Sequence, residues 1–341
     1  MYRKRSRQCC ALMIIVSVCL RLCMALGLDE QLGTLALEVA GRQQTAEFLL
    51  YLETGQRAQV PTEPERPQVL VVECQTVTLP PEPVVAAAAE DITVKGACTY
   101  AYDKQALLTS PTTLDFTGEG PKVLIIHSHS TEAYDPSDGL TYKEIPSWRT
   151  LDETRNVIAV GQVLADKLTQ LGVEVIHDTT IHDYPDYNTS YYNCLQSISA
   201  WQQKYPQIQM VLDIHRDAVE DEQGQAVAML SNQSGTNVAQ LMLVVGTDEG
   251  GLEHPNWQDN LANALKLQSV LMGEYPGLCR SLDLRTERFN QHVAPGAVLI
   301  EVGTTGNTLT QAKASAELLA QAVAKTIEKM QQEEGWETVA N

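Results

Sequence analysis

Basic residues are scarce in this chain. It holds 24 Lys and Arg against 43 Asp and Glu, a net charge of −19 over 341 residues. Five of the basic residues lie in the first 28 positions, which hold no acid, so the rest is more acidic still. This balance argues against nucleic acid as a ligand, because nucleic acid attracts positive protein surfaces.

Several catalytic and metal-binding motifs are also missing. No C-x-x-C occurs among the eight cysteines, which argues against a zinc ribbon, and their scatter argues against a dense disulfide framework. No G-x-S-x-G occurs, so a serine hydrolase of that type is disfavoured. A phosphoesterase using Mn²⁺ or Mg²⁺ stays an alternative, although the chain has no D-x-D pair.

The N-terminus has the pattern of a membrane-targeting segment. Basic residues at 3–7 precede an apolar stretch that Arg21 interrupts and that ends near Leu28. Its first 12 apolar positions would suit a signal peptide, but a clear small-x-small cleavage site is lacking. We therefore predict a cytoplasmic tail and uncleaved anchor over residues 1–28. Acids follow the span, which predicts a single-pass protein of the cell membrane with an extracytoplasmic body.

The remainder divides by composition. Residues 29–120 are expected to form a juxtamembrane helix and then a spacer rich in Pro and Ala. Over residues 121–333, strand-like and helix-like patterns alternate, with helices predicted at 156–171, 188–204, 256–274 and 310–332. This predicts an α/β domain with a mostly parallel sheet flanked by helices. Residues 334–341 are expected to be a tail.

One stretch combines a buried strand with metal-ligand chemistry. Val123–Ile126 is an apolar run, and His127, His129 and Glu132 follow it. If the chain stays extended, both imidazoles lie on one side. Ligands of open parallel sheets bind at the carboxyl ends of strands. The pair alone is as typical of polar loop chemistry as of a metal site.

Two further apolar runs repeat this pattern. Met210–Ile214 is followed by His215 and Arg216, and Ala297–Ile300 is followed by Glu301. Together the three runs supply the residues of a site with two His ligands, one carboxylate ligand and a separate catalytic Glu. Such a donor set suits Zn²⁺.

These motifs resemble the stage II sporulation protein P family, whose members are membrane-anchored cell-wall hydrolases that endospore-forming bacteria use during engulfment. The resemblance spans about Pro121–Lys329 and rests on a series of motifs in one order: His127–Tyr134, Asn156–Gly161, His182–Tyr191, Asp213–Ala218, Phe289–His292 and Glu301–Thr308. It implies peptidoglycan as substrate and stage II sporulation proteins D and M as partners.

The family is similar to zinc-dependent N-acetylmuramoyl-L-alanine amidases of the third class, which implies a role for each candidate. His129 matches the first His ligand, with His127 as its competitor, His215 matches the second, and Glu301 matches the catalytic Glu. The acidic ligand stays open between Asp152, which stands four residues before Asn156, and its rivals Glu132 and Glu153.

Arg216 is a further catalytic candidate. It could hold a substrate carboxylate or orient Glu301, or simply form a salt bridge with Asp213 or Asp217.

The sequence therefore predicts a zinc-dependent N-acetylmuramoyl-L-alanine amidase acting on peptidoglycan. The resemblance also implies endopeptidase activity on peptide cross-links. A non-catalytic wall-binding or scaffold module and a different metallohydrolase are the alternatives. The presence of both His215 and Glu301 argues against a degenerate site.

Overall fold

The computed structural model describes residues 84–145 and 148–332. The predicted anchor at 1–28, the predicted spacer up to residue 83 and the predicted tail at 334–341 lie outside the described residues. Within the described residues, no helix combines the length and apolar character needed to cross a membrane.

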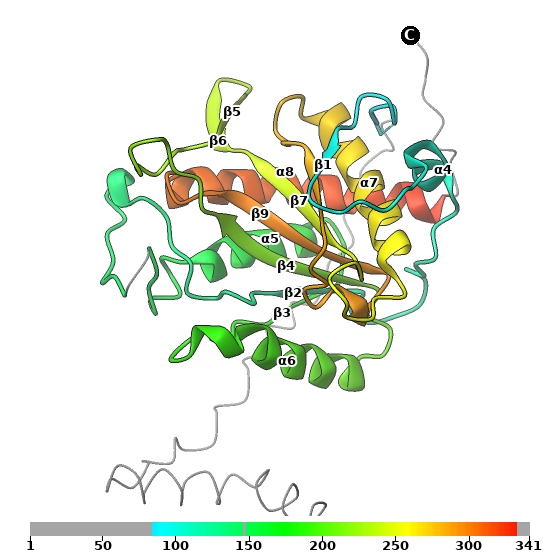
Figure 1. Cartoon of the computed structure of the whole chain (residues 1–341), viewed down its shortest axis with the longest axis horizontal. Helices are drawn as coiled ribbons and strands as arrows, with labels where there is room; N and C mark the ends of the chain where they lie inside the picture. Colours follow the sequence, from blue (N-terminus) through cyan, green and yellow to red (C-terminus); the bar gives the residue numbers. More distant parts are fainter. Residues whose placement is uncertain (1–83, 146–147, 333–341) are drawn as a thin grey trace, which may run out of the picture. The chain divides into compact units, whose positions relative to one another are not determined.

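A seven-stranded sheet forms the centre of the described part (Figure 1). Its spatial order is β1-β8-β7-β9-β4-β2-β3. Every pairing in it is parallel except that of β7 with β9, which confirms the predicted mostly parallel sheet. The strands are β1 (Val94–Lys95), β2 (Val123–Ile126), β3 (Val175–His177), β4 (Met210–Asp217), β7 (Leu241–Gly246), β8 (Leu282–Arg285) and β9 (Gly296–Thr304).

A two-stranded antiparallel hairpin precedes β7. It consists of β5 (Leu230–Gln233) and β6 (Thr236–Ala239), joined through Ser234 and Gly235. Both turn residues have positive φ, at 51° and 87°, as a tight hairpin turn requires. The sequence did not predict this hairpin, because its strands are mostly polar.

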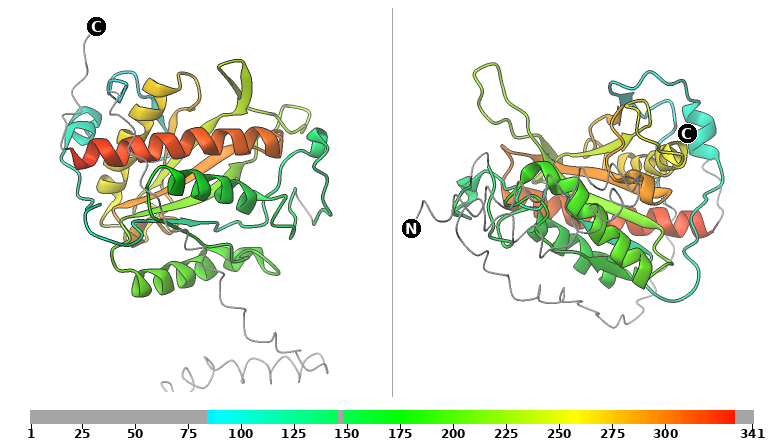
Figure 2. Two further views of the ribbon diagram at one scale, coloured as in Figure 1. Left: turned by 180° about the vertical axis from the view of Figure 1, so that it is seen from behind. Right: turned by 60° about the horizontal axis from the view of Figure 1, so that its bottom comes forward.

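Helices cover both faces of the sheet (Figure 2). The larger hydrophobic cluster joins the sheet to α5, α7 and α8, and the smaller one joins it to α6. The main helices are α5 (Val157–Gln170), α6 (Ser190–Lys204), α7 (Trp257–Glu274) and α8 (Leu309–Gln331), close to the predicted bounds. Three short 3₁₀ turns complete the described part: η1 (Pro136–Asp138), η2 (Tyr187–Thr189) and η3 (Gln291–Val293).

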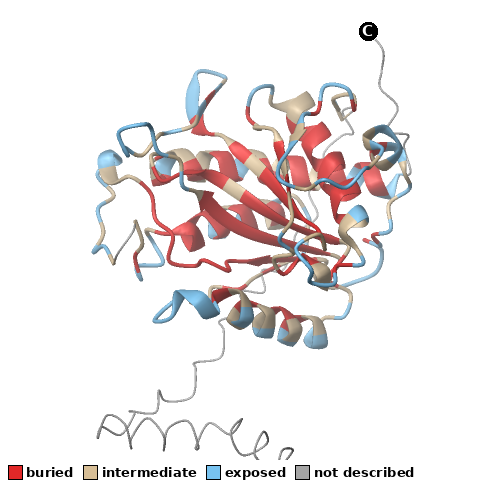
Figure 3. Cartoon of the chain, viewed as in Figure 1, coloured by how far each residue is buried: buried red, intermediate tan, exposed pale blue. Residues whose placement is uncertain are grey.

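β2 is buried on both faces, as its apolar run predicts (Figure 3). Val123 and Ile125 belong to the larger cluster, whereas Leu124 and Ile126 belong to the smaller one. This alternation is the period of a strand, and it decides which face each following side chain takes.

The folded unit begins before the predicted boundary at residue 121. β1 pairs in parallel with β8, and α4 (Lys104–Thr109) contributes Leu108 to the larger cluster. Ile92 and Leu114 are buried in the same cluster. The end of the predicted spacer, from residue 84 onward, is therefore part of the domain.

Candidate active site

The side chains of β4 point alternately to the two faces of the sheet. Leu212 and Ile214 belong to the cluster shared with α5, α7 and α8, whereas Val211 belongs to the α6 cluster. Because side chains alternate along a strand, Asp213 and His215 lie on the α6 side. The site develops there, at the carboxyl end of β4.

His129, Glu132 and His215 come together on this side. His215 Nδ1 lies 3.6 Å from Glu132 Oε2, and the ring centroids of His129 and His215 are 5.3 Å apart. All three side chains are buried. The structure thus gathers both predicted His ligands with one of the three acids that the sequence left open.

His127 points away from this cluster. Its Nε2 lies 2.9 Å from His177 Nε2, and its Nδ1 lies 3.0 Å from the Ile214 carbonyl oxygen. It packs beneath Gly161 of α5, where an added Cβ would lie 2.5 Å from His127 Nε2. Burial and the neighbouring His177 lower the pKa of His127 to about 3. The expected competitor of His129 therefore packs against α5.

Asp152 and Glu153 are exposed and lie outside the cluster. The Asp152 carboxylate accepts hydrogen bonds from the backbone N and hydroxyl of Thr154, at 3.0 and 2.6 Å. This is a local Asx turn, which Asp favours just ahead of a helix. The structure therefore does not bring Asp152, the first choice of acidic ligand, to the two histidines.

Glu301 stands opposite His215 in the register of β9 against β4. Its side chain is partly buried, and Oε2 is a buried atom without a hydrogen-bond partner. Burial raises the pKa of the Glu301 carboxyl well above its usual range, Glu132 and Asp217 add to this, and His215 opposes it. Glu301 thus has the setting of a proton-transfer residue.

Asp213 is a site residue that the sequence argument passed over. Its Oδ1 lies 2.9 Å from His215 Nε2, and its two carboxylate oxygens accept from the backbone N and hydroxyl of Ser128, at 2.8 and 2.6 Å. His215 Nε2 has no hydrogen-bond partner of good geometry, so its contact with Asp213 is an ion pair rather than a linear hydrogen bond. The i, i+2 spacing of Asp213 and His215 was the available signal.

Asp213 and His215 shift each other's pKa. Burial alone would lower the pKa of His215, but Asp213, Glu132 and Glu301 outweigh it and raise that pKa to about 10. Burial alone would raise the pKa of Asp213, but His215 and the Ser128 donors lower it to about 2. By contrast, burial lowers the pKa of His129 to about 4, against the attraction of Glu132.

Arg216 donates to backbone carbonyl groups next to the cluster. Its Nε donates to the Ala133 carbonyl oxygen at 2.9 Å and its Nη2 to that of Trp148 at 3.0 Å. Its backbone N donates to Glu132 Oε2 at 3.1 Å. The guanidinium thus anchors the backbone around Glu132 and does not form the expected alternative salt bridge with Asp213 or Asp217, while its expected roles toward a substrate and Glu301 stay predictions.

Tyr187 and Arg149 lie over the cluster. The Tyr187 ring stacks on His129, with centroids 4.5 Å apart, and its hydroxyl lies 3.1 Å from His129 Nε2. The Arg149 guanidinium covers the Tyr187 ring at 4.6 Å and forms a 2.6 Å ion pair with the buried Asp183. The sequence analysis gave His182–Tyr191 as a family motif but could not place Tyr187 against His129.

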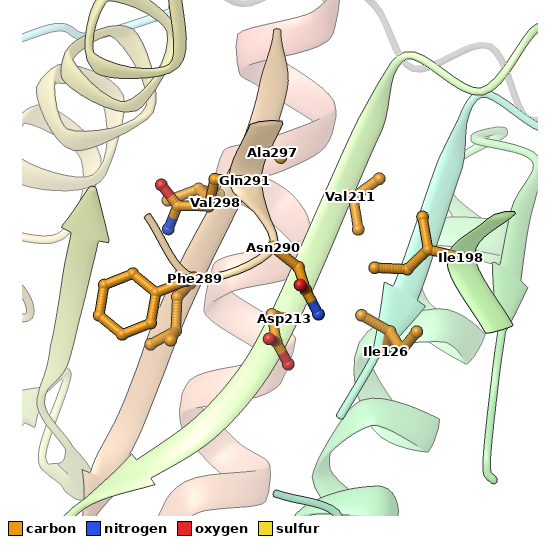
Figure 4. Close-up of a pocket in the computed structure, with 10 residues that line it drawn as sticks. Ile126, Ile198, Val211, Asp213, Phe289, Asn290, Gln291, Ala297 and Val298 are labelled. Atoms are coloured by element: carbon orange, nitrogen blue, oxygen red, sulfur yellow. The ribbon is translucent and has the colours of Figure 1, made fainter. Parts of the chain in front are cut away.

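A small pocket lies along the same face of the sheet (Figure 4). Asp213 lines it from β4, and Phe289 and Asn290 line it from the segment ahead of η3. The rest of its wall consists of Gln291 of η3 and apolar residues of β2, β4, α6 and β9. The pocket therefore lies beside the buried Asp213, between the sheet and α6.

Comparison with known proteins identifies the family. The family model of stage II sporulation protein P matches residues 57–324, which is more than half of the chain. The chain belongs to the stage II sporulation protein P family. This confirms the resemblance found in the motifs, and the match extends into the predicted spacer.

A protein of Bacillus subtilis has a similar sequence. Stage II sporulation protein P of Bacillus subtilis (strain 168) is 25% identical over 211 residues, which cover 59% of this chain and 49% of that protein. The match thus spans about half the length of this relative.

Two solved structures have similar folds. The N-acetylmuramoyl-L-alanine amidase from Clostridium difficile 630 is 15% identical with a TM-score of 0.37, covering 64% of this chain and 100% of that chain. The amidase AmiC2 of Nostoc punctiforme is 13% identical with a TM-score of 0.35, covering 63% and 99%. At these scores neither structure bears on the activity of this chain.

The side chains of this cluster are of the types that bind zinc. Two imidazoles and a carboxylate are the donors of catalytic zinc sites. His129 Nδ1 is buried without a hydrogen-bond partner, as a ligand atom awaiting a metal would be. Over residues 84–145 and 148–332, no three His, Cys, Asp or Glu side chains converge closely enough to hold a metal as they stand. A bound ion would have to draw His129, Glu132 and His215 together.

Proposed function

We propose that this chain is a zinc-dependent peptidoglycan hydrolase that cleaves the amide bond between N-acetylmuramic acid and L-alanine. The proposal rests on one observation. His129, Glu132, His215 and Glu301 lie together near the carboxyl ends of β2, β4 and β9. Membership of the stage II sporulation protein P family supports the choice of the cell wall as substrate.

His129, Glu132 and His215 would hold the metal, and His215 would lose its proton on binding it. Zinc, when bound, supplies a Lewis acid that lowers the pKa of water towards about 7 and polarises a carbonyl group. Arg216 and Arg149 hold Glu132 in place, through the Arg216 backbone N and a 3.4 Å ion pair from Arg149. Glu132 is thus held in place by contacts of its own.

Glu301 would move the proton in this reaction. Its raised pKa lets the carboxylate take a proton from the attacking water and return it to the leaving amine. Its unpartnered Oε2 leaves an oxygen free for that exchange. Proton transfer by a positioned carboxyl group contributes about 10²–10⁴-fold to hydrolysis rates.

The proposal extends to the cellular setting. We place the enzyme in sporulation engulfment, anchored to the cell membrane by residues 1–28 with its hydrolase domain outside the cytoplasm. Stage II sporulation proteins D and M are the proposed partners. Expression timing and fractionation of sporulating cells test this setting separately from the chemistry.

The chemistry is tested by digestion of purified peptidoglycan with the full chain, with and without a chelator, followed by mass mapping of the products. We expect stem peptides beginning with L-alanine, and their loss with chelator. Products cut within the peptide cross-links would add the endopeptidase activity. Binding to the wall without any product would support the non-catalytic alternative, and chelator-insensitive cleavage would contradict zinc dependence.

A further inference from the structure

Two of the sequence motifs have no role in the proposed hydrolysis, and they meet beside the cluster. Tyr191 ends the motif His182–Tyr191, and Phe289 begins the motif Phe289–His292. The two rings are in contact, with centroids 5.9 Å apart. Asn290 donates from Nδ2 to the Tyr191 carbonyl oxygen at 2.7 Å, across 99 positions of sequence. The two motifs therefore form one local structure.

The segment that carries Phe289 is strained and held in place. Phe289 has a φ of +51°, in the left-handed region that residues with a side chain rarely adopt. Asn290 ties the segment to Tyr191, and the Gln291 side chain is bonded to two backbone groups of β7, at 2.9 and 2.8 Å. Strain of this kind is concentrated at functional sites, where surrounding contacts maintain it. Figure 4 shows Phe289 and Asn290 over the face of the sheet that carries Asp213.

Tyr191 lies at the cluster itself. Its partly buried ring contacts that of His129 in a T-shaped arrangement, with centroids 5.2 Å apart. Burial raises the pKa of the phenol well above its usual range, and the nearby carboxylates of Asp213, Glu132 and Glu301 add to this. The hydroxyl has no hydrogen-bond partner in the part of the chain that the structure describes. A neutral donor therefore stands free beside the groups proposed to react.

We propose that Tyr191 is a further catalytic residue, whose hydroxyl donates a hydrogen bond to the carbonyl oxygen of the scissile amide, and that Phe289 is a positioning residue that holds the Tyr191 ring against His129. This rests on the proposed hydrolysis and adds a donor for its substrate. Negative charge develops on the carbonyl oxygen as water attacks, and a fixed donor stabilises that charge. Tyr191 keeps its proton throughout, because Glu301 carries out the proton transfer.

The hydroxyl is tested by Tyr191→Phe, which removes one oxygen atom and keeps the ring. The kinetics of the zinc-loaded full chain are measured on a soluble disaccharide–tetrapeptide fragment of peptidoglycan. We expect kcat to fall by about 10²–10³-fold, the loss that follows removal of one such donor, with KM nearly unchanged. Tyr192→Phe, at the exposed next position of α6, is the matched control and should keep the wild-type kinetics.

Two further measurements on Tyr191→Phe do not depend on turnover. The zinc content per chain should equal that of the wild type. Calorimetry on the chelator-treated chain should give the wild-type Kd for the same fragment, because the hydroxyl acts on charge that develops only during the reaction.

Phe289 is tested through its coupling to Tyr191. Phe289→Leu should lower kcat in the wild-type background and have little further effect in the Tyr191→Phe background, where no hydroxyl is left to misplace. Phe289→Tyr keeps a ring at this position and should keep most of the wild-type rate. An equal loss of rate from Phe289→Leu in both backgrounds would indicate a structural role only and overturn the positioning role.

The outcomes separate this inference from the function on which it rests. If the wild-type chain releases no product, both fall. If it cleaves the fragment and Tyr191→Phe keeps its kcat, the function stands and the inference is wrong. A raised KM and Kd at unchanged kcat, or a loss of zinc, would likewise overturn the role of the hydroxyl. If Phe289→Leu fails to fold, Tyr191→Phe still decides.

Discussion

Glu301 combines a raised pKa with a place opposite a proposed ligand, and it is the residue on which turnover should depend. Glu301→Gln keeps the size of the side chain but cannot accept a proton from water. We expect the variant to retain zinc and to lose at least about 10²-fold in rate per zinc-loaded molecule. Loss of zinc would instead make Glu301 a ligand, and an unchanged rate would remove it from the reaction.

His129 and His127 differ in the face of the sheet on which they lie. We expect His129→Ala to abolish zinc binding. His127→Ala should retain zinc but lower the free energy of unfolding by about 1–3 kcal/mol, because its ring is buried against α5. Zinc content and denaturant unfolding of both variants decide this, and loss of zinc only in His127→Ala would reverse the assignment.

At the residue scale, strand periodicity explains what could be predicted. His215 and Glu301 end apolar runs, and the carboxyl ends of neighbouring parallel strands bring them together. Asp213 was predictable by the same rule, since it stands two residues before His215. That Glu132 rather than Asp152 lies beside His215 could not be predicted, because it depends on how the loop after β2 folds back. Contacts from Arg149 and Arg216 hold Glu132 in that place.

In α5, replacing Gly161 by Ala should destabilise the protein, although Ala favours the helix more than Gly does. Ala is favoured over Gly inside a helix by about 1 kcal/mol. At Gly161, however, a Cβ would lie 2.5 Å from His127 Nε2 and 2.7 Å from His177 Nε2. Overpacking of this kind costs about 1–3 kcal/mol, so we expect Gly161→Ala to lower the free energy of unfolding.

A double-mutant cycle provides the control. His177→Ala removes one of the two rings that the new methyl group would meet, so Gly161→Ala should cost less in that background. Denaturant unfolding of the four proteins measures the difference. A stabilising effect of Gly161→Ala in the wild-type background would show that the contact between α5 and the two histidines is looser than described.

At the element scale, long amphipathic patterns and continuous apolar runs such as that of β2 were predicted well, whereas β1 and β8 were not. The helix predicted at 156–171 begins at its capping residue Asn156 and is followed by Gly172 at a φ of +84°, as the pattern indicated. β8 lacks the continuous apolar run of β2, since charged residues alternate with its two leucines, and β1 is only two residues long. Their place in the sheet is set by pairing with β7 and with each other.

In the molecule as a whole, the segment before residue 121 belongs to the folded unit. Ile92, Leu108 and Leu114 are buried in the larger cluster, and each such side chain contributes about 1.5–3 kcal/mol. That sum approaches the total stability of many domains, about 5–15 kcal/mol. We expect a fragment of residues 121–341 to unfold at a much lower temperature than one of residues 84–341. Equal melting temperatures by circular dichroism would contradict this.

The most direct test of the proposed metal centre is the zinc content per chain of two variants, Glu132→Gln and Asp152→Asn, measured beside the wild type. Glu132 lies 3.6 Å from His215 Nδ1, whereas Asp152 is exposed and bonded to Thr154. We predict one zinc per chain in the wild type and in Asp152→Asn, and none in Glu132→Gln. Zinc retained in Glu132→Gln and lost in Asp152→Asn would contradict the site described for this family member.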